Sequence, residues 1–415
     1  MTAAAPAPSR VRRAVTNPYV VTIASTAFVA LLSAATYSLV SRIGDPDQLV
    51  DYSTARRLVS FVLPIAALGY VITLPVFIAK NPGRPRAAKR LAGEQYAATI
   101  ILALVLAALV VIFRNPVEDL LLLPYEVLLA AIFLTASITY VTILFAYLRG
   151  HERFTAGAIL NVLANGVFAV AAVFAVPSGL WAALVGWGCA NLLLAYGLAR
   201  RFGAQTLPRR IRSKKFFLRS LARVPGDAAF AGLFVLPVLM APASIAAADR
   251  GVFNYFFVLL SMVLAATQPI AIVLLPRVAG VDAKSGRRGR LAFILLAGSA
   301  AIGLMVALVM KFAAEPFIAI ALGEEYRSGA YVLEAMWLAP IGLSIFAAVR
   351  TLLDGWSNVP LSPLSSLLAL AVLIAMTQAD SQFDGLLSGV GVAYGVLGVA
   401  VTAAVLVLIR RGEAT

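Results

Sequence analysis

Apolar residues in this chain are gathered into blocks of about 20, and about twelve such blocks follow one another, separated by short polar connections. A helix of that length crosses the roughly 30 Å hydrocarbon layer of a bilayer. Only 13% of the residues are charged, which is too few for the surface of a water-soluble chain. Backbone groups in lipid must be hydrogen-bonded internally, so each block is expected to be a helix. The pattern predicts an all-α polytopic membrane protein.

The predicted membrane segments divide evenly into two sets of six. They are Tyr19–Ser41, Tyr52–Ala79, Gln95–Phe113, Tyr125–Leu148, Thr155–Val176, Gly179–Ala199, Phe217–Ala241, Val252–Leu275, Leu291–Met310, Tyr331–Thr351, Leu361–Thr377 and Leu386–Ile409. The longest basic connection lies between the two sets, which indicates two similar lobes. The expected organisation is a tail at 1–18, an N-lobe at 19–199, a basic linker at 200–216, a C-lobe at 217–409 and a second tail at 410–415.

Basic residues favour one side of this arrangement. With the N-terminus in the cytoplasm, about 27 of the 34 Lys and Arg residues fall in cytoplasmic connections, as the positive-inside bias requires. The excess of Arg over Lys is typical of a GC-rich, bacterial genome. The first apolar run is too long for the core of a signal peptide, so we expect it to remain as a span. The expected location is the bacterial inner membrane, with both termini cytoplasmic.

Several function classes lack support in the sequence. The net charge of +15 lies in short connections between apolar blocks, which argues against nucleic acid as a partner. Motifs for nucleophilic catalysis, zinc or nucleotide binding are missing from the sequence, and its single cysteine, Cys189, permits no intrachain disulfide. We therefore expect no enzyme activity and no cofactor. His151, the one histidine, is open to two interpretations, a pH sensor or an ordinary loop residue.

Charged residues inside membrane segments are costly and therefore mark candidate functional sites. Arg56 and Arg57 lie near the start of the second segment, with side chains about 100° apart on a helix. Together with Arg42 and Arg350 they form the predicted substrate-binding set. Guanidinium groups suit phosphate, and a cavity lined by them attracts anions. The alternative is that the arginines extend to the headgroups.

Two acidic residues are candidates for ion coupling, Asp227 near the start of the seventh segment and Glu334 in the tenth. Asp227 is equally compatible with a stabilising position at a helix N-terminus. Arg350 and Asp354 are four residues apart, so a local ion pair is expected between them.

Prolines near the cytoplasmic ends of the second and eighth segments predict places where helices bend during transport. The predicted hinge residues are Pro64, Pro75, Pro269 and Pro276. A simpler interpretation is that prolines are common in membrane helices.

Several short stretches, in order along the chain, resemble a known family. They are Ser41–Asp47, Asp51-Tyr52, Gly69, Pro75–Ala79, Tyr147–Phe154, Asn161, Gly251–Tyr255, Leu275–Arg277 and Leu322–Tyr326. The stretches resemble bacterial oligosaccharide flippases, in the polysaccharide-export branch of the multidrug/oligosaccharidyl-lipid/polysaccharide exporter superfamily. Val76 and the adjacent arginines 56 and 57 depart from that family's pattern.

The resemblance implies two six-helix lobes around a central cavity that opens alternately to each side. It implies a polyprenyl-pyrophosphate-linked oligosaccharide as the substrate, moved from inside to outside. The expected partners are membrane lipid, a polysaccharide polymerase and glycosyltransferases, and we hypothesise that the membrane potential or a proton resets the transporter. Three alternatives remain open at this point. One is a cation-coupled multidrug exporter of the same superfamily, although the first segment lacks an acidic residue. The second is a major-facilitator transporter, suggested by Asp282–Arg288. The third is a non-transporting membrane partner of a polysaccharide polymerase, against which the lack of a long outer domain argues mildly.

Overall fold

A computed structural model describes residues 18–43, 46–81, 83–121, 123–205, 207–210, 212–242, 245–278, 287–357 and 361–414. The described residues form helices and short connections and include no strand, as the apolar blocks predict. The segment Asp282–Gly286, part of the loop that suggested a major-facilitator transporter, lies outside the described residues.

Helices lie at all six predicted membrane segments of the N-lobe. They are α2 (Pro18–Ile43), α3 (Pro46–Ala66) with α4 (Tyr70–Lys80), α5 (Pro85–Ile112), α7 (Tyr125–Gly150), α8 (Phe154–Val162) continuing through the π-helical turn η1 (Leu163–Val167) into α9 (Phe168–Val173), and α10 (Leu180–Arg201). A short helix, α6 (Arg114–Leu121), and a 3₁₀ turn, η2 (Val176–Ser178), join them at the end away from the basic connections.

The C-lobe follows the same plan. After α11 (Lys214–Leu221) come α12 (Val224–Met240), α13 (Ala247–Val278), α14 (Arg287–Phe312), α15 (Ala314–Ala321), the 3₁₀ helix η3 (Glu324–Ala330), α16 (Tyr331–Ala335), α17 (Ala339–Trp356), α18 (Leu361–Ala379) and α19 (Phe383–Ala414). By length and apolar composition, nine helices of the described chain can cross a membrane, or ten if the bent pair Glu324–Ala335 and Ala339–Asp354 is one span. The two further predicted segments are α12, which is apolar but 17 residues long, and the interrupted pair α3–α4.

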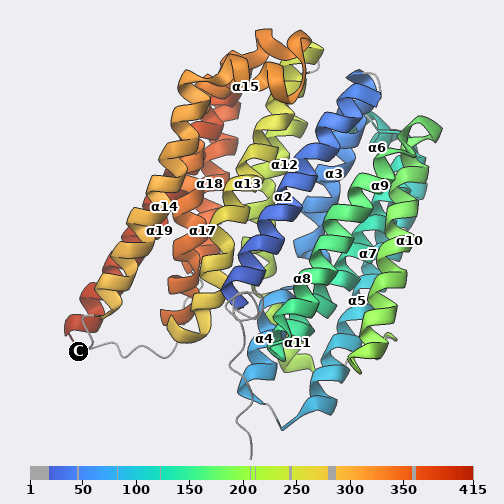
Figure 1. Ribbon diagram of the computed structural model, residues 1–415, viewed down its shortest axis with the longest axis vertical. Coiled ribbons are helices and arrows are strands. Elements are labelled where there is room, and N and C mark those ends of the chain that lie inside the picture. Colours follow the sequence, from blue (N-terminus) through green and yellow to red (C-terminus); the bar gives the residue numbers. More distant parts are fainter. Residues whose placement is uncertain are drawn as a thin grey trace, which may run out of the picture.

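The two lobes are built by the same helix pairings, which can be followed in Figure 1 as a blue-green and a yellow-red group. In the N-lobe α7 packs on α5, α10 and the α3–α4 pair, and in the C-lobe α17 packs on α14, α19 and α13. Likewise α2 packs on α8, and α12 on α18. Across the lobes, α2 packs on α13 and α3 on α12. The chain is thus two similar six-segment bundles that meet through their first two segments.

The second segment is broken where the prolines predict a bend. Helix α3 contains Pro64 and ends at Ala66, and Leu68 and Gly69 then take left-handed backbone conformations, with φ of 46° and 70°. A Cβ on Gly69 would lie 2.5 Å from the carbonyl oxygen of Ser220, so the close approach of α11 also requires glycine. The counterpart α13 continues as one helix through positions 269 and 276. The hinge assignment stays a prediction.

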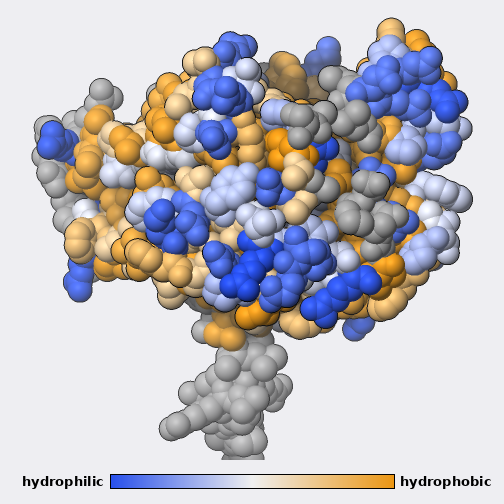
Figure 2. Space-filling model, turned by 90° about the horizontal axis from the view of Figure 1, so that it is seen from above, coloured by the Kyte–Doolittle hydropathy of each residue, from blue (hydrophilic) through white to orange (hydrophobic). Residues whose placement is uncertain are grey.

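The lobes share one large hydrophobic core at the end opposite the basic connections. There Tyr37 of α2 and Tyr52 of α3 join the same buried cluster as Phe253 and Phe256 of α13. At the other end the buried clusters around Tyr70 and Leu160 draw, among the described residues, only on the N-lobe, its linker and α11. Figure 2 views the end with the shared core and shows hydrophilic residues gathered on it, with hydrophobic residues toward the sides. The lobes are therefore joined at this end, which we call the joined end.

Candidate functional site

Helix α3 carries two adjacent arginines into the region where the lobes meet. Arg56 and Arg57 lie ten and eleven residues after Pro46, about 15 Å along the helix axis. Because consecutive side chains point about 100° apart on a helix, they enter different surroundings. Arg57 faces the C-lobe, and Arg56 faces the interior of the N-lobe.

Arg57 crosses the interface between the lobes. Its guanidinium donates to the backbone carbonyl oxygen of Asn254 in α13 and to that of Phe234 in α12, the latter at 3.5 Å. The side chain of Asn254 donates in turn to the Ser53 hydroxyl at 2.8 Å. Arg57 is 7% exposed, and its charge lies over the ring of Phe257, 4.9 Å from the centroid. Carbonyl dipoles and an aromatic face thus stabilise this cation.

Arg56 lies in a partly buried polar site within the N-lobe. It donates to the Tyr52 hydroxyl at 3.2 Å and to the Ser33 hydroxyl of α2 at 3.3 Å, and it stacks 4.6 Å from the ring centroid of Trp187 in α10. The Trp187 indole donates to the carbonyl oxygen of Ala164 at 2.6 Å. That carbonyl belongs to the π-helical turn η1, and such turns are frequent at functional sites.

The ion pairs among the described residues include neither Arg56 nor Arg57. Their neighbours are hydroxyls, carbonyl oxygens and rings, which reduce the cost of a buried charge without neutralising it. The two side chains therefore give the region around α3 a positive potential, which favours an anion.

Arg350, by contrast, is neutralised within the C-lobe. It pairs with Asp227 of α12 and, at 3.6 Å, with Asp354 one turn later in α17, which confirms the predicted local pair. Asp354 also forms an ion pair with Arg223 at 3.1 Å and accepts a hydrogen bond from the Ser362 hydroxyl at 3.0 Å. The predicted substrate-binding arginine and the predicted ion-coupling aspartate are thus one ion-pair network, with two arginines and two aspartates. Its formal charge is zero, so it exerts little pull on an anion.

The remaining predicted residues do not join the interior arginines. Arg42 is exposed in the last turn of α2, where a long cationic side chain can reach the headgroup region. Glu334 is half-buried in the short helix α16. Pro64 and Pro75 lie inside α3 and α4, on either side of the break.

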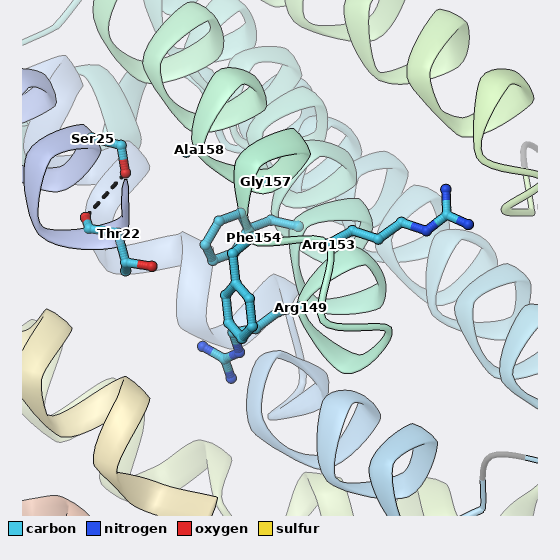
Figure 3. A pocket seen from close by; sticks show the side chains of 8 residues that line it. Thr22, Ser25, Arg149, Arg153, Phe154, Gly157 and Ala158 are labelled. Atoms are coloured by element: carbon cyan, nitrogen blue, oxygen red, sulfur yellow. Dashed lines mark hydrogen bonds between the residues drawn. The ribbon is translucent and has the colours of Figure 1, made fainter. Parts of the chain in front are cut away.

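Arg149 is a cation outside the predicted site residues and directly follows the predicted segment Tyr125–Leu148. It lies in the last turn of α7, beside a small pocket between the start of α2 and the start of α8. Its guanidinium donates to the carbonyl oxygen of Val71 in α4 at 3.2 Å. Figure 3 shows Arg149 and Arg153 at this pocket, with guanidinium groups that point to different sides. Arg153 stacks on Phe202, 4.9 Å from its centroid.

No clear sequence signal marks Arg149, because the predicted segment ends at Leu148 whereas α7 continues to Gly150. A further buried charge, Glu94 of α5, is fully buried and accepts from the backbone and hydroxyl of Ser213, both at 3.2 Å. It also pairs with Arg90 at 3.6 Å. This carboxylate fixes the basic linker to the N-lobe. Within the described residues, no group of acidic, histidine or cysteine side chains could hold a metal ion.

No protein-family model and no curated protein sequence matches the chain. Solved structures do match it. An inward-facing multidrug resistance MATE family transporter of the MOP superfamily matches with a TM-score of 0.73 at 14% identity, covering 96% of this chain and 99% of that chain. An outward-facing multidrug resistance MATE family transporter of the MOP superfamily matches with a TM-score of 0.69 at 14% identity, covering 96% of this chain and 97% of that chain. The Vibrio cholerae MATE transporter VcmN in its bent form gives 0.67 at 17% identity, covering 97% and 98%. The chain is therefore a multi-pass membrane protein with the fold of MATE transporters.

Proposed function

We propose that this protein is a transporter that moves an amphiphile with an anionic head across the membrane by alternating access. The observation that carries the proposal is Arg56, a cation held by hydroxyls and a tryptophan ring inside the N-lobe and absent from the ion pairs of the described residues. A guanidinium in such a setting retains donors for a phosphate or carboxylate. Arg149, at the opposite end of α7 from the joined end, offers a second cation near the side from which cargo would enter.

The cargo we infer is a polyprenyl-pyrophosphate-linked oligosaccharide, moved from the cytoplasmic to the outer leaflet of a bacterial inner membrane. Two observations support this choice. One is the cationic interior of the N-lobe, and the other is that several short sequence stretches, in the same order along the chain, resemble oligosaccharide flippases. Glycosyltransferases that build the cargo and a polymerase that uses it follow as predicted partners. Transport of this kind requires no catalytic residue in the chain.

A multidrug exporter is the second candidate, because the matching solved structures are of MATE transporters, two of them described as multidrug resistance proteins. Export of cations is favoured by acidic residues in the first helices. Helix α2 contains no acidic residue, and its charged residue in the last turn is Arg42. The match to the MATE fold over 96% of the chain argues against the major-facilitator alternative.

The test uses purified protein in vesicles and two cargoes, a fluorescent lipid-linked oligosaccharide and a cationic dye. We expect the lipid-linked oligosaccharide to change leaflet and the dye to remain outside. Arg56→Gln removes the charge but keeps a hydrogen-bonding side chain, and it should slow flipping about tenfold or more, the effect of losing one charged hydrogen bond. Arg200→Gln, at an exposed arginine at the cytoplasmic end of α10, is the matched control and should flip at the parent rate.

Movement of the dye without the lipid-linked oligosaccharide would assign the protein to the multidrug exporters. Equal flipping by the parent and the Arg56→Gln variant would show that the cationic N-lobe does not hold the cargo. Both variants are checked by size-exclusion chromatography so that a folding defect is recognised.

A further inference from the structure

At the joined end, polar contacts as well as the shared core hold the lobes together; at the other end, the Thr73 hydroxyl of α4 lies 2.8 Å from the Ser220 hydroxyl of α11. Two side chains of the N-lobe bond to backbone carbonyls of the C-lobe: Arg57 reaches Asn254 and Phe234, and the Ser38 hydroxyl of α2 donates to Ala321 at 2.6 Å. Both contacts lie at the joined end, which the charge distribution places outside the cell. Opening this end requires both to break, together with the bond from the Asn254 amide of α13 to the Ser53 hydroxyl of α3.

Arg57 differs from Ser38 because it brings a full charge. Burying a cation away from water is costly unless a counter-charge or several acceptors stabilise it. Carbonyl oxygens and the Phe257 ring supply part of this stabilisation. The Nε of Arg57 and the Oδ1 of Asn254 are nevertheless buried without a hydrogen-bond partner. The closed arrangement therefore leaves donor capacity on Arg57 unused.

When the lobes separate at this end, Arg57 loses its carbonyl acceptors and enters the opened space still charged, because a guanidinium does not release its proton. An anion in that space then stabilises the open state more than the closed one. A ligand shifts an equilibrium between states by this kind of difference in affinity.

We propose that Arg57 is the gate residue of the outer end: it keeps the lobes closed by bonding to the C-lobe carbonyls and, on opening, exchanges them for the anionic group of the cargo. The exchange links opening of the gate to the presence of an anionic cargo. The proposal rests on the proposed function for the identity of that cargo, whereas the closing role of Arg57 rests on its own contacts.

The test measures closure of the outer end directly. Cys189 is the only cysteine, so Cys189→Ser gives a background without native thiols. Ser38→Cys and Ala321→Cys then place one thiol on each lobe at a contact separate from Arg57, and their rate of disulfide formation in vesicles reports how often this end is closed. In this parent we expect fast cross-linking, slowed several-fold by millimolar inorganic pyrophosphate, the probe for an anionic head.

Arg57→Gln should slow cross-linking about tenfold without pyrophosphate, because two charged hydrogen bonds to the C-lobe are lost. It should also remove the effect of pyrophosphate. Arg57→Lys keeps the charge but not the paired donors, so we expect an intermediate rate and a retained pyrophosphate effect. Ser53→Ala removes the neutral bond from Asn254 across the same interface while leaving the Arg57 contacts, and it should slow cross-linking much less than Arg57→Gln does and keep the pyrophosphate effect.

Cross-linking of the Arg57→Gln variant at the parent rate would overturn the gate role. An undiminished pyrophosphate effect in that variant would overturn the exchange. Neither readout needs transport of an oligosaccharide. If the cross-linking results are as expected but the lipid-linked oligosaccharide is not flipped, the gate role of Arg57 is supported and the proposed cargo is wrong. If the oligosaccharide is flipped but the cross-linking results are not as expected, the proposed cargo is supported and the gate role is wrong. The Arg57→Lys variant keeps the test decisive if Arg57→Gln does not fold.

Discussion

Arg350 and Asp227 depend on each other inside the C-lobe. The exposed fractions of their side chains are 21% and 15%, so removing one leaves a largely buried charge on the other. We predict that Asp227→Asn lowers the free energy of unfolding by about 3 kcal/mol. The double variant Asp227→Asn/Arg350→Gln should lose less than the sum of the two single losses, because the two positions are coupled. Thermal unfolding in detergent measures both. Additive losses would mean that the pair is not coupled.

His151 provides a pH dependence outside the membrane segments. Burial, and next the nearby charges of Arg153 and Lys89, lower the pKa of this imidazole below its usual value. The folded protein therefore binds fewer protons here than the unfolded chain, and its stability falls as the pH drops below about 6.5 toward the folded-state pKa. We predict that Tm decreases between pH 7.5 and pH 5, and that His151→Gln reduces this decrease. An identical slope in the variant would assign the pH dependence to other groups.

The sequence could mark these residues but not their partners. Arg56 and Arg57 attract attention because charges are costly in apolar segments. The contact of Arg57 with Asn254 joins residues 197 positions apart, and that of Arg350 with Asp227 joins residues 123 apart. Such pairings depend on how the lobes pack, which local periodicity does not encode. The Arg350–Asp354 pair could be predicted because a helix brings residues four apart together.

At the scale of elements, the break between α3 and α4 is the place where the backbone most clearly requires a glycine. Gly69 has a φ of 70° and faces the Ser220 carbonyl at the end of α11. Gly69→Ala adds a methyl group where there is no space. Alanine must also adopt the left-handed conformation of this position, which costs about 1–2 kcal/mol. We predict a loss of at least that size in the free energy of unfolding.

The control for Gly69→Ala is Gly186→Ala, in α10. A Cβ at Gly186 meets nothing within 4 Å, so alanine there should be neutral or stabilise by up to about 1 kcal/mol. Denaturation of the two variants in the same detergent compares them. Similar stabilities of the two variants would show that α11 can move away from α4 at little cost.

The long helices were predictable because each apolar block is as long as the bilayer is thick. The short helices α6, α11 and α15 were not, since eight residues show too few turns for a clear period. The break at Gly69 lay inside one predicted segment, where only proline gave a signal. No residue pattern in the sequence indicates the π-helical turn η1. Its Ala164 carbonyl oxygen accepts a hydrogen bond from the Trp187 indole.

At the scale of the molecule, the lobes are joined at one end by a common core, whereas the buried clusters at the other end consist, among the described residues, of N-lobe residues with the linker and α11. The interface between the lobes is built symmetrically, because each lobe contributes its first two segments: α2 packs on α13 and α3 packs on α12. A rocking motion of the lobes would open the joined end. The assignment of the joined end to the outside rests on the basic connections and can be tested separately.

Accessibility of single cysteines tests that orientation. In the Cys189→Ser background, Glu324→Cys places a thiol in η3 at the joined end, and Gly83→Cys places one between α4 and α5 at the basic end; both positions are exposed. A membrane-impermeant maleimide applied to intact cells should label Glu324→Cys and should label Gly83→Cys only after the membrane is opened. The physical reason is the concentration of Lys and Arg in the connections on the Gly83 side, because the positive-inside bias predicts that such connections stay in the cytoplasm. The reverse labelling would place Arg57 at the cytoplasmic end, so that the gate would control entry of the cargo rather than its release.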